Sequence, residues 1–184
     1  MYKPKKFWNQ RALNRPNREW DGQVMRVAEW VKPLLKVDSK VLDVGSGGGR
    51  LWKTFKQWNI PALIYPCDIS TEMAKIHFKN TGIRPTIWDG KTIPFKDEMF
   101  DLTVCHLFFL HVRPELIERV WNECVRVTKK YWFLTINIGT GEKRQPHCFV
   151  HDYLSLLWKT KIEMKVLRWE KGWTTEFLLL EKRT

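Results

Sequence analysis

The stretch Val41-Leu42-Asp43-Val44-Gly45-Ser46-Gly47-Gly48-Gly49-Arg50 decides the fold. Its first part, apolar residues around Asp43, is typical of a buried strand. Four glycines in five positions follow, and glycine lets the backbone reach positive φ and lets a ligand approach where a Cβ would clash. The amphipathic segment Leu51–Trp58 then predicts a helix. Amides at the start of such a helix point outward and commonly hold a nucleotide-like ligand.

The composition fits a globular domain with a real core. A length of 184 residues is sufficient for such a core, and no apolar stretch approaches a membrane span. The charged N-terminus has no apolar region after it, so we expect no secretory signal. Four cysteines stand far apart without a C-x-x-C pair, which predicts reduced core thiols, a cytoplasmic location and no metal site. They are Cys67, Cys105, Cys124 and Cys148.

The charge is the least ordinary property of the chain. A net charge of +12 suits a polyanionic partner such as a nucleic acid, although it also serves solubility. Six basic residues precede the first acidic one, Glu19, and Lys143-Arg144 adds more in a later loop. The six are Lys3, Lys5, Lys6, Arg11, Arg15 and Arg18. Residues 1–18 therefore predict a basic arm or lid, and 19–184 a single domain.

Strands and helices alternate along the rest of the chain. The fold class that this predicts is α/β: a doubly wound, mostly parallel seven-stranded sheet with an antiparallel C-terminal hairpin strand and helices on both faces. Pro66 is expected where pairing of its strand has stopped. Helical patterns place Trp30, Trp52, Trp121 and Trp158 in the core. The predicted strands are Lys40–Val44, Ala62–Cys67, Pro85–Trp88, Phe100–Cys105, Tyr131–Ile136, Ile162–Trp169 and Thr174–Glu181. The predicted helices begin at Glu19 (with an early end or kink at Pro33), after the glycine turn, at Thr71, at Arg113 and at His151.

The spacing of the glycines argues against a dinucleotide site, because G-x-G-x-x-G would need glycine where Arg50 stands. The chain instead has Asp43-x-Gly45-x-Gly47-x-Gly49. Four later segments follow: Cys67-Asp68-Ile69-Ser70-Thr71-Glu72-Met73, Asp89–Asp101, Val104–Val112 and Glu123–Lys130. Together they resemble, in order, the motifs of the class I S-adenosylmethionine-dependent methyltransferases over about residues 38–136. The resemblance implies a Rossmann-like fold and S-adenosylmethionine as cofactor.

The resemblance also implies the residues that hold the cofactor. Asp68 would accept both ribose hydroxyls, since a carboxylate offers acceptors and no donor. Ile69 and Met73 would lie against the adenine, while Asp89 and Gly90 would meet its edge. The full set is Asp43, Gly45, Ser46, Gly47, Gly49, Asp68, Ile69, Met73, Asp89, Gly90 and His106.

Methyl transfer from a sulfonium is a direct displacement, so the protein aligns the nucleophile and sometimes deprotonates it. By position, His106 and His111 are the candidate bases. The alternatives are that His106 lines the methionine end of the cofactor and that His111 fixes its loop. His147, His151, Trp8 and Arg11 are candidates for contact with the substrate.

The methyl acceptor is left open by the sequence. No D-P-P-Y, N-P-P-Y or Pro-Cys pair follows the strand Phe100–Cys105, which argues against several base and amide methyltransferases. The net charge slightly favours RNA or another polyanion, and the style of the motifs equally suits a small molecule. A third hypothesis is a cofactor-binding but inactive partner subunit. The oligomeric state is not predicted.

Overall fold

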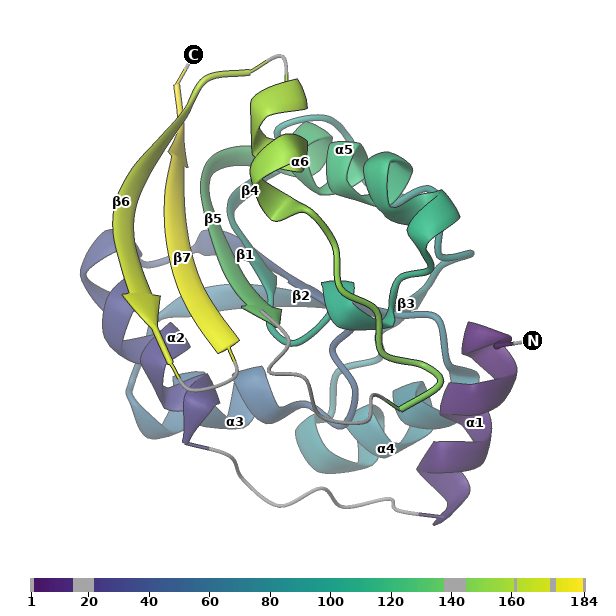
Figure 1. Ribbon diagram of the computed structural model, residues 1–184. Helices are drawn as coiled ribbons and strands as arrows, with labels where there is room; N and C mark the ends of the chain where they lie inside the picture. The colour runs from purple at the N-terminus through teal and green to yellow at the C-terminus, as the bar shows by residue number, and fades with distance from the viewer. Residues whose placement is uncertain (1, 15–21, 138–144, 161, 173–174, 184) are drawn as a thin grey trace. The chain divides into compact units, whose positions relative to one another are not determined.

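The computed structural model (Figure 1) describes residues 2–14, 22–137, 145–160, 162–172 and 175–183. Its strands form a seven-stranded sheet in the order β3-β2-β1-β4-β5-β7-β6. β7 runs antiparallel to both β5 and β6, whereas β1 with β2, β2 with β3 and β4 with β5 are parallel. This confirms the predicted α/β class and its antiparallel C-terminal hairpin. The chain has two compact units, Met1–Asp89 and Gly90–Thr184.

The first unit carries the glycine turn. Its elements are α1 (Pro4–Asn14), α2 (Gln23–Val31), η1 (Lys32–Leu34), β1 (Ser39–Val44), α3 (Arg50–Gln57), β2 (Ala62–Asp68), α4 (Thr71–Thr81) and β3 (Thr86–Ile87). The basic segment at the N-terminus is thus helical over Pro4–Asn14, and this helix packs against α4. As predicted, the helix before Pro33 ends early: it stops at Val31, and Pro33 lies in the short 3₁₀ turn that follows.

The predicted place of Pro66 is wrong, because β2 continues to Asp68 and Pro66 stands in register with Asp43 of β1. The carbonyl of Cys67 accepts bonds from the β1 side and that of Asp68 from the β3 side. The backbone N–H and C=O groups of successive residues in a strand point to alternate neighbouring strands. The backbone of Pro66, like that of Asp68, therefore faces the β3 side. Pairing with β3 begins only at Cys67. The missing N–H of Pro66 therefore falls where no neighbouring strand needs it.

The second unit contains the C-terminal hairpin. Its elements are β4 (Phe100–Cys105), η2 (Phe109–His111), η3 (Pro114–Leu116), α5 (Ile117–Val127), β5 (Thr128–Asn137), α6 (Tyr153–Lys159), β6 (Met164–Lys171) and β7 (Thr175–Lys182). Figure 1 shows β5, β7 and β6 side by side. The chain enters β5 directly from α5, and Thr128 Oγ1 bridges this junction by donating to the Cys124 carbonyl at 2.6 Å.

An aromatic core stabilises this unit. The rings of Trp121 and Trp132 are 4.5 Å apart between centroids, and the ring of Phe109 is 5.3 Å from that of Trp121. All three side chains are fully buried, and burying a large apolar side chain contributes about 1.5–3 kcal/mol. Phe109 belongs to η2, just after β4, so this core also fixes the loop in which His111 lies.

The prediction for Trp158 is wrong. Trp30 and Trp121 are buried and Trp52 is half-buried, but the side chain of Trp158 is 91% exposed. The helix α6 buries Tyr153 and Leu156. Residue 158 lies about 200° around the helix from residue 156 and so points to the opposite face. Within the described residues, no helix is long and apolar enough to cross a membrane.

Candidate functional site

Three glycines of the turn need the left-handed backbone that glycine alone adopts at little cost. Gly45, Gly47 and Gly49 have φ values of 73°, 50° and 87°. They are the three glycines of the D-x-G-x-G-x-G pattern. The turn is also tied to the end of β2, because Gly45 N and Ser46 N both donate to the Cys67 carbonyl, at 2.9 and 3.0 Å.

Asp68 joins the glycine turn to the start of α4. Its Oδ2 accepts from Gly47 N at 2.9 Å and its Oδ1 accepts from Ser70 N at 2.8 Å. Burial raises the pKa of this carboxyl, while the amides of Ser70 and Gly47 act in the opposite direction. A carboxylate has about four lone-pair sites, so both oxygens keep acceptor capacity for hydroxyls of a ligand.

A second buried carboxyl, that of Asp43, is on the penultimate residue of β1, next to the turn. Its side chain is 5% exposed, and burial raises its pKa to about 7 against the favourable charge of Arg50, with Asp68 adding to the rise. The Oγ of Ser46 is buried too, and has no hydrogen-bond partner among the described residues. Leaving such a group unpaired costs about 1–3 kcal/mol. A polar ligand at the turn would satisfy it.

Ser70 caps α4 and also anchors α1. Its Oγ accepts from Met73 N at 3.0 Å and donates to Asn9 Oδ1 at 2.7 Å. The sequence predicted substrate contacts for two residues near Asn9, Trp8 and Arg11. In the structure Arg11 Cζ lies 5.9 Å from the centroid of the Trp8 ring. Asn9 itself was missed, because a polar residue on a polar helix carries no signal of its partner.

The sequence also carries no sign of the role of His77, which packs against the glycine turn at Gly49. It is fully buried, and its Nδ1 lies 3.0 Å from both the Ile83 carbonyl and Thr81 Oγ1. Burial lowers its pKa, so the ring is neutral near pH 7. A Cβ built on Gly49 would stand 2.5 Å from Thr81 Cγ2 and 3.4 Å from His77 Nε2. The turn is thus packed tightly against the end of α4.

Gly49→Ala should therefore lower the free energy of unfolding by about 1–3 kcal/mol, through left-handed strain and the clash with Thr81. The matched control is Gly22→Ala, since Gly22 has ordinary helical φ and open space around its Cβ position. Urea unfolding of both variants measures the difference. Equal midpoints would contradict the tight packing of Gly49.

The other predicted cofactor residues are placed as follows. Ile69 and Met73 are half-buried next to Asp68 and in the first turn of α4, and Asp89 is exposed. Gly90 has a positive φ of 75°, so it too needs glycine. In the second unit, His106 follows β4 and its Nδ1 lies 2.9 Å from Thr135 Oγ1 of β5.

Two more histidines contact backbone carbonyls around the loop after β4. His111 Nδ1 lies 3.1 Å from the His147 carbonyl, and His151 Nε2 lies 3.0 Å from the Phe109 carbonyl. A ring nitrogen that meets a carbonyl carries a proton and donates it, so these two nitrogens do not act as bases. Burial lowers the pKa of His151. The contact ties His111 to the segment of His147, and it leaves Nε2 of His111 as the acceptor nitrogen of the ring.

The segments around Glu123 and Pro94 form a structural clamp. Arg126 donates to the carbonyls of Ile93 and Phe95 at 2.9 and 2.8 Å. It also pairs with Glu123 at 2.7 Å and with Asp97 at 2.7 Å. Glu123 in turn accepts from Ile93 N at 2.8 Å, and its hydrogen bond with Arg126 lowers its pKa. These residues hold the loop before β4.

Comparison with known proteins agrees with this geometry. The family described as a methyltransferase domain matches residues 42–133, from β1 to β5. This match covers half of the chain, and the chain therefore belongs to that family. A curated relative, an uncharacterized protein of Methanocaldococcus jannaschii, is 37% identical over 134 residues, which are 67% of this chain. The chain spans 60% of that relative's length.

Solved structures share the fold at low sequence identity. Magnesium protoporphyrin IX methyltransferase from Synechocystis, with bound SAH, has a TM-score of 0.75 at 15% identity and covers 97% of this chain and 98% of its own. A SAM-dependent methyltransferase of Thermotoga maritima, a possible histamine N-methyltransferase, has a TM-score of 0.66 at 19% identity and covers 97% and 99%. A SAM-dependent methyltransferase from Aquifex aeolicus has a TM-score of 0.63 at 17% identity, and the match covers 89% of this chain and 99% of that one.

Proposed function

We propose that this chain is an S-adenosylmethionine-dependent methyltransferase that transfers the methyl group to a small molecule. One observation carries the proposal: the Asp68 carboxylate is bonded to both Gly47 N and Ser70 N. The two segments that resemble cofactor motifs are thereby joined into one cradle. The buried Ser46 Oγ, without a partner in the described part of the chain, fits a polar ligand at this cradle.

In this proposal the turn and Asp43 hold the amino-acid end of the cofactor, and Asp68 holds the ribose. Ile69 and Met73 contact the adenine, Asp89 and Gly90 its edge, and His106 the methionine end. When bound, the cofactor supplies an electrophilic methyl group on a sulfonium. The residues of the chain align the acceptor and exclude water, and alignment alone contributes up to roughly 7–11 kcal/mol at its best.

A hydroxyl acceptor would also need a base, and His106 is the residue we propose. It follows β4 directly, whereas His111 lies at the end of η2. His106 Nδ1 meets the hydroxyl of Thr135, which can donate or accept, so the ring can take either tautomer. When Nδ1 donates to Thr135, Nε2 can accept a proton; when Nδ1 accepts from Thr135, Nε2 carries the proton and can donate it.

A small-molecule acceptor is supported by the names of the structural neighbours that state one, a porphyrin and histamine. The prediction of an RNA or other polyanionic acceptor rests on the net charge of +12 alone. Lys143 and Arg144, on which that lean partly depends, lie outside the described residues, as do Arg15 and Arg18. A cytoplasmic location stays a prediction from cysteine usage, and the division into an arm and one domain also stays a prediction.

The deciding experiment incubates the purified protein with methyl-labelled S-adenosylmethionine and separate pools of metabolites and RNA. Label in the metabolite pool alone supports the proposal. Label in the RNA pool, lost steeply with added salt, would favour the polyanion hypothesis. Cofactor binding without transfer to either pool would favour the inactive partner subunit.

Thermal unfolding with added ligands tests the choice of cofactor. S-adenosylhomocysteine should raise Tm more than NAD at equal concentration, because stabilisation grows with the ratio of ligand concentration to Kd. The sequence argues against NAD because Arg50 stands where the dinucleotide pattern needs its third glycine. A larger shift with NAD would overturn the assignment of the cofactor.

A further inference from the structure

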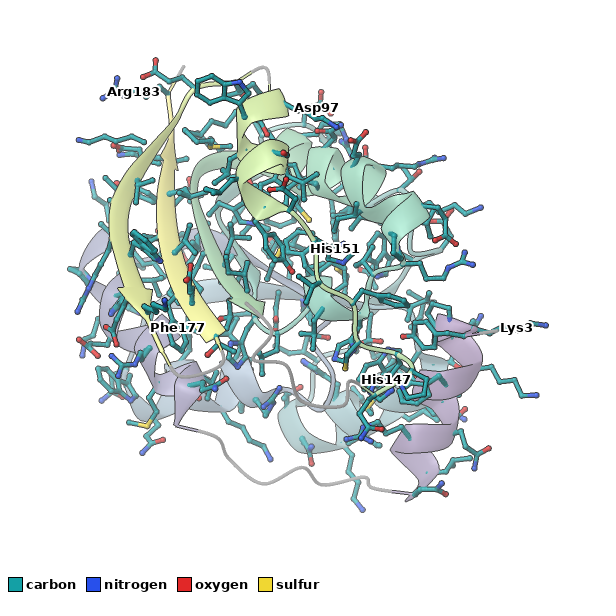
Figure 2. The ribbon with its side chains drawn as sticks, in the orientation of Figure 1. Lys3, Asp97, His147, His151, Phe177 and Arg183 are labelled. Carbon is teal, nitrogen blue, oxygen red and sulfur yellow. The ribbon has the colours of Figure 1, made fainter. Side chains whose placement is uncertain are left out.

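Two histidines and a cysteine converge in the second unit, beyond the carboxyl ends of β4 and β5. His111 ends η2 after β4, while His147 and Cys148 lie on the segment that leads from β5 to α6. Figure 2 shows His147 and His151 along this segment. One ligand atom from each of His111, His147 and Cys148 lies within 4.8 Å of the others.

The scaffold around this cluster is already formed. Cys148 Sγ lies 4.0 Å from His111 Nδ1, and the rings of His111 and His147 are stacked at 5.3 Å with an interplanar angle of 18°. The backbones are also joined, because Phe149 N donates to the Leu110 carbonyl at 2.7 Å. Cys148 N donates to the Gln145 carbonyl at 2.9 Å, which closes a turn around His147. The three side chains are therefore held together by more than their own contacts.

We propose that His111, His147 and Cys148 bind a divalent transition metal ion, with Zn²⁺ as the best match. Imidazole and thiolate ligands suit zinc, whereas a magnesium or calcium site would need carboxylate and carbonyl oxygens. On a tetrahedral zinc ion, a nitrogen and a sulfur ligand are about 3.6 Å apart. The distance of 4.0 Å between His111 Nδ1 and Cys148 Sγ needs only a small adjustment to reach this.

Three protein ligands leave one of four coordination positions to water or another small ligand, as in zinc sites that are not purely structural. Binding replaces the S–H bond of Cys148 by an S–Zn bond and releases the proton to solvent. His111 Nδ1 carries the proton that it donates to the His147 carbonyl, so its bond to the ion requires this proton to move through solvent to Nε2 of the same ring, and the contact with the carbonyl is lost. The ion would use none of the residues proposed to hold the cofactor.

The test uses the whole protein, freed of metal with a chelator and titrated with Co²⁺, then with competing Zn²⁺. We expect one equivalent of Co²⁺ to give a thiolate-to-cobalt charge-transfer band that Zn²⁺ abolishes. Cys148→Ser should remove the band, and both Cys148→Ser and His147→Gln should weaken Zn²⁺ binding at least about tenfold. The matched control is Asp152→Ala, an exposed residue of the same segment that is bonded to Ser155 and not to the cluster, and this variant should leave the Zn²⁺ affinity unchanged.

Binding of S-adenosylhomocysteine reports on the fold of each variant and separates the two proposals. Unchanged affinity for it in Cys148→Ser, with the band lost, supports the metal site. Absence of the band in the folded wild-type protein, or Zn²⁺ binding that survives Cys148→Ser, would overturn it. If the wild-type protein binds Zn²⁺ but not S-adenosylhomocysteine, the proposed function fails and the metal site stands.

Discussion

Asp68→Ala should weaken the binding of S-adenosylmethionine and S-adenosylhomocysteine alike by at least about tenfold. Hydrogen bonds to a charged group contribute about 1.5–3 kcal/mol, and about 1.4 kcal/mol corresponds to a factor of ten in Kd. The variant loses the proposed acceptor of the ribose hydroxyls. It also leaves the amides of Gly47 and Ser70 without their acceptor, so the turn itself loosens.

Calorimetry with S-adenosylhomocysteine measures the effect, and Asp152→Ala is the matched control. Asp152 likewise accepts from a backbone amide near the start of a helix, that of Ser155 at 3.0 Å, but it is exposed and caps α6. Its removal should cost cap stability of about 0.5–2 kcal/mol and leave the affinity unchanged. A folded Asp68→Ala protein that binds as tightly as the wild type would refute the assignment of the site.

Asp43→Asn should make the ligand-free protein more stable above neutral pH and should weaken the binding of the cofactor. Burial raises the pKa of Asp43 from 3.8 to about 7, so the folded protein binds this proton more tightly than the unfolded chain. Stability is therefore fully present below the unfolded pKa and is lost as pH rises through the folded pKa. At about 1.4 kcal/mol for each pKa unit, the ionised carboxylate costs roughly 4 kcal/mol at pH 8.

Asparagine stays neutral and escapes this loss. The advantage of the variant over the wild type in free energy of unfolding should grow by about 3 kcal/mol between pH 5 and pH 8. Urea unfolding at both pH values measures it, and comparing two pH values cancels any difference in packing that does not depend on pH. Asp68, whose pKa burial also raises, is present in both proteins. Parallel stability curves would show that Asp43 does not titrate as proposed.

The sequence by itself determined the parts of this protein that depend on neighbouring residues. The turn needed glycine at positions 45, 47 and 49 because the backbone there is left-handed, a steric property that can be read locally. The helix predicted to begin at Thr71 begins there, where Ser70 caps it. The strand Phe100–Cys105 was predicted with its observed bounds, since apolar residues at positions 100, 102, 104 and 105 mark a largely buried strand.

Only the tertiary structure decided which distant groups meet. Apolar periodicity reports which face an element buries, and it misled for Trp158 because α6 is short and buries a different face. Asn9 reaches Ser70 across 61 positions of sequence, and His111 meets His147 across 36. A lone histidine or asparagine carries no local mark of its partner, because its polar contacts depend on where the packing of the core places the chain. Sequence spacing thus argued against a metal site, whereas the fold brings His111 to His147 and Cys148.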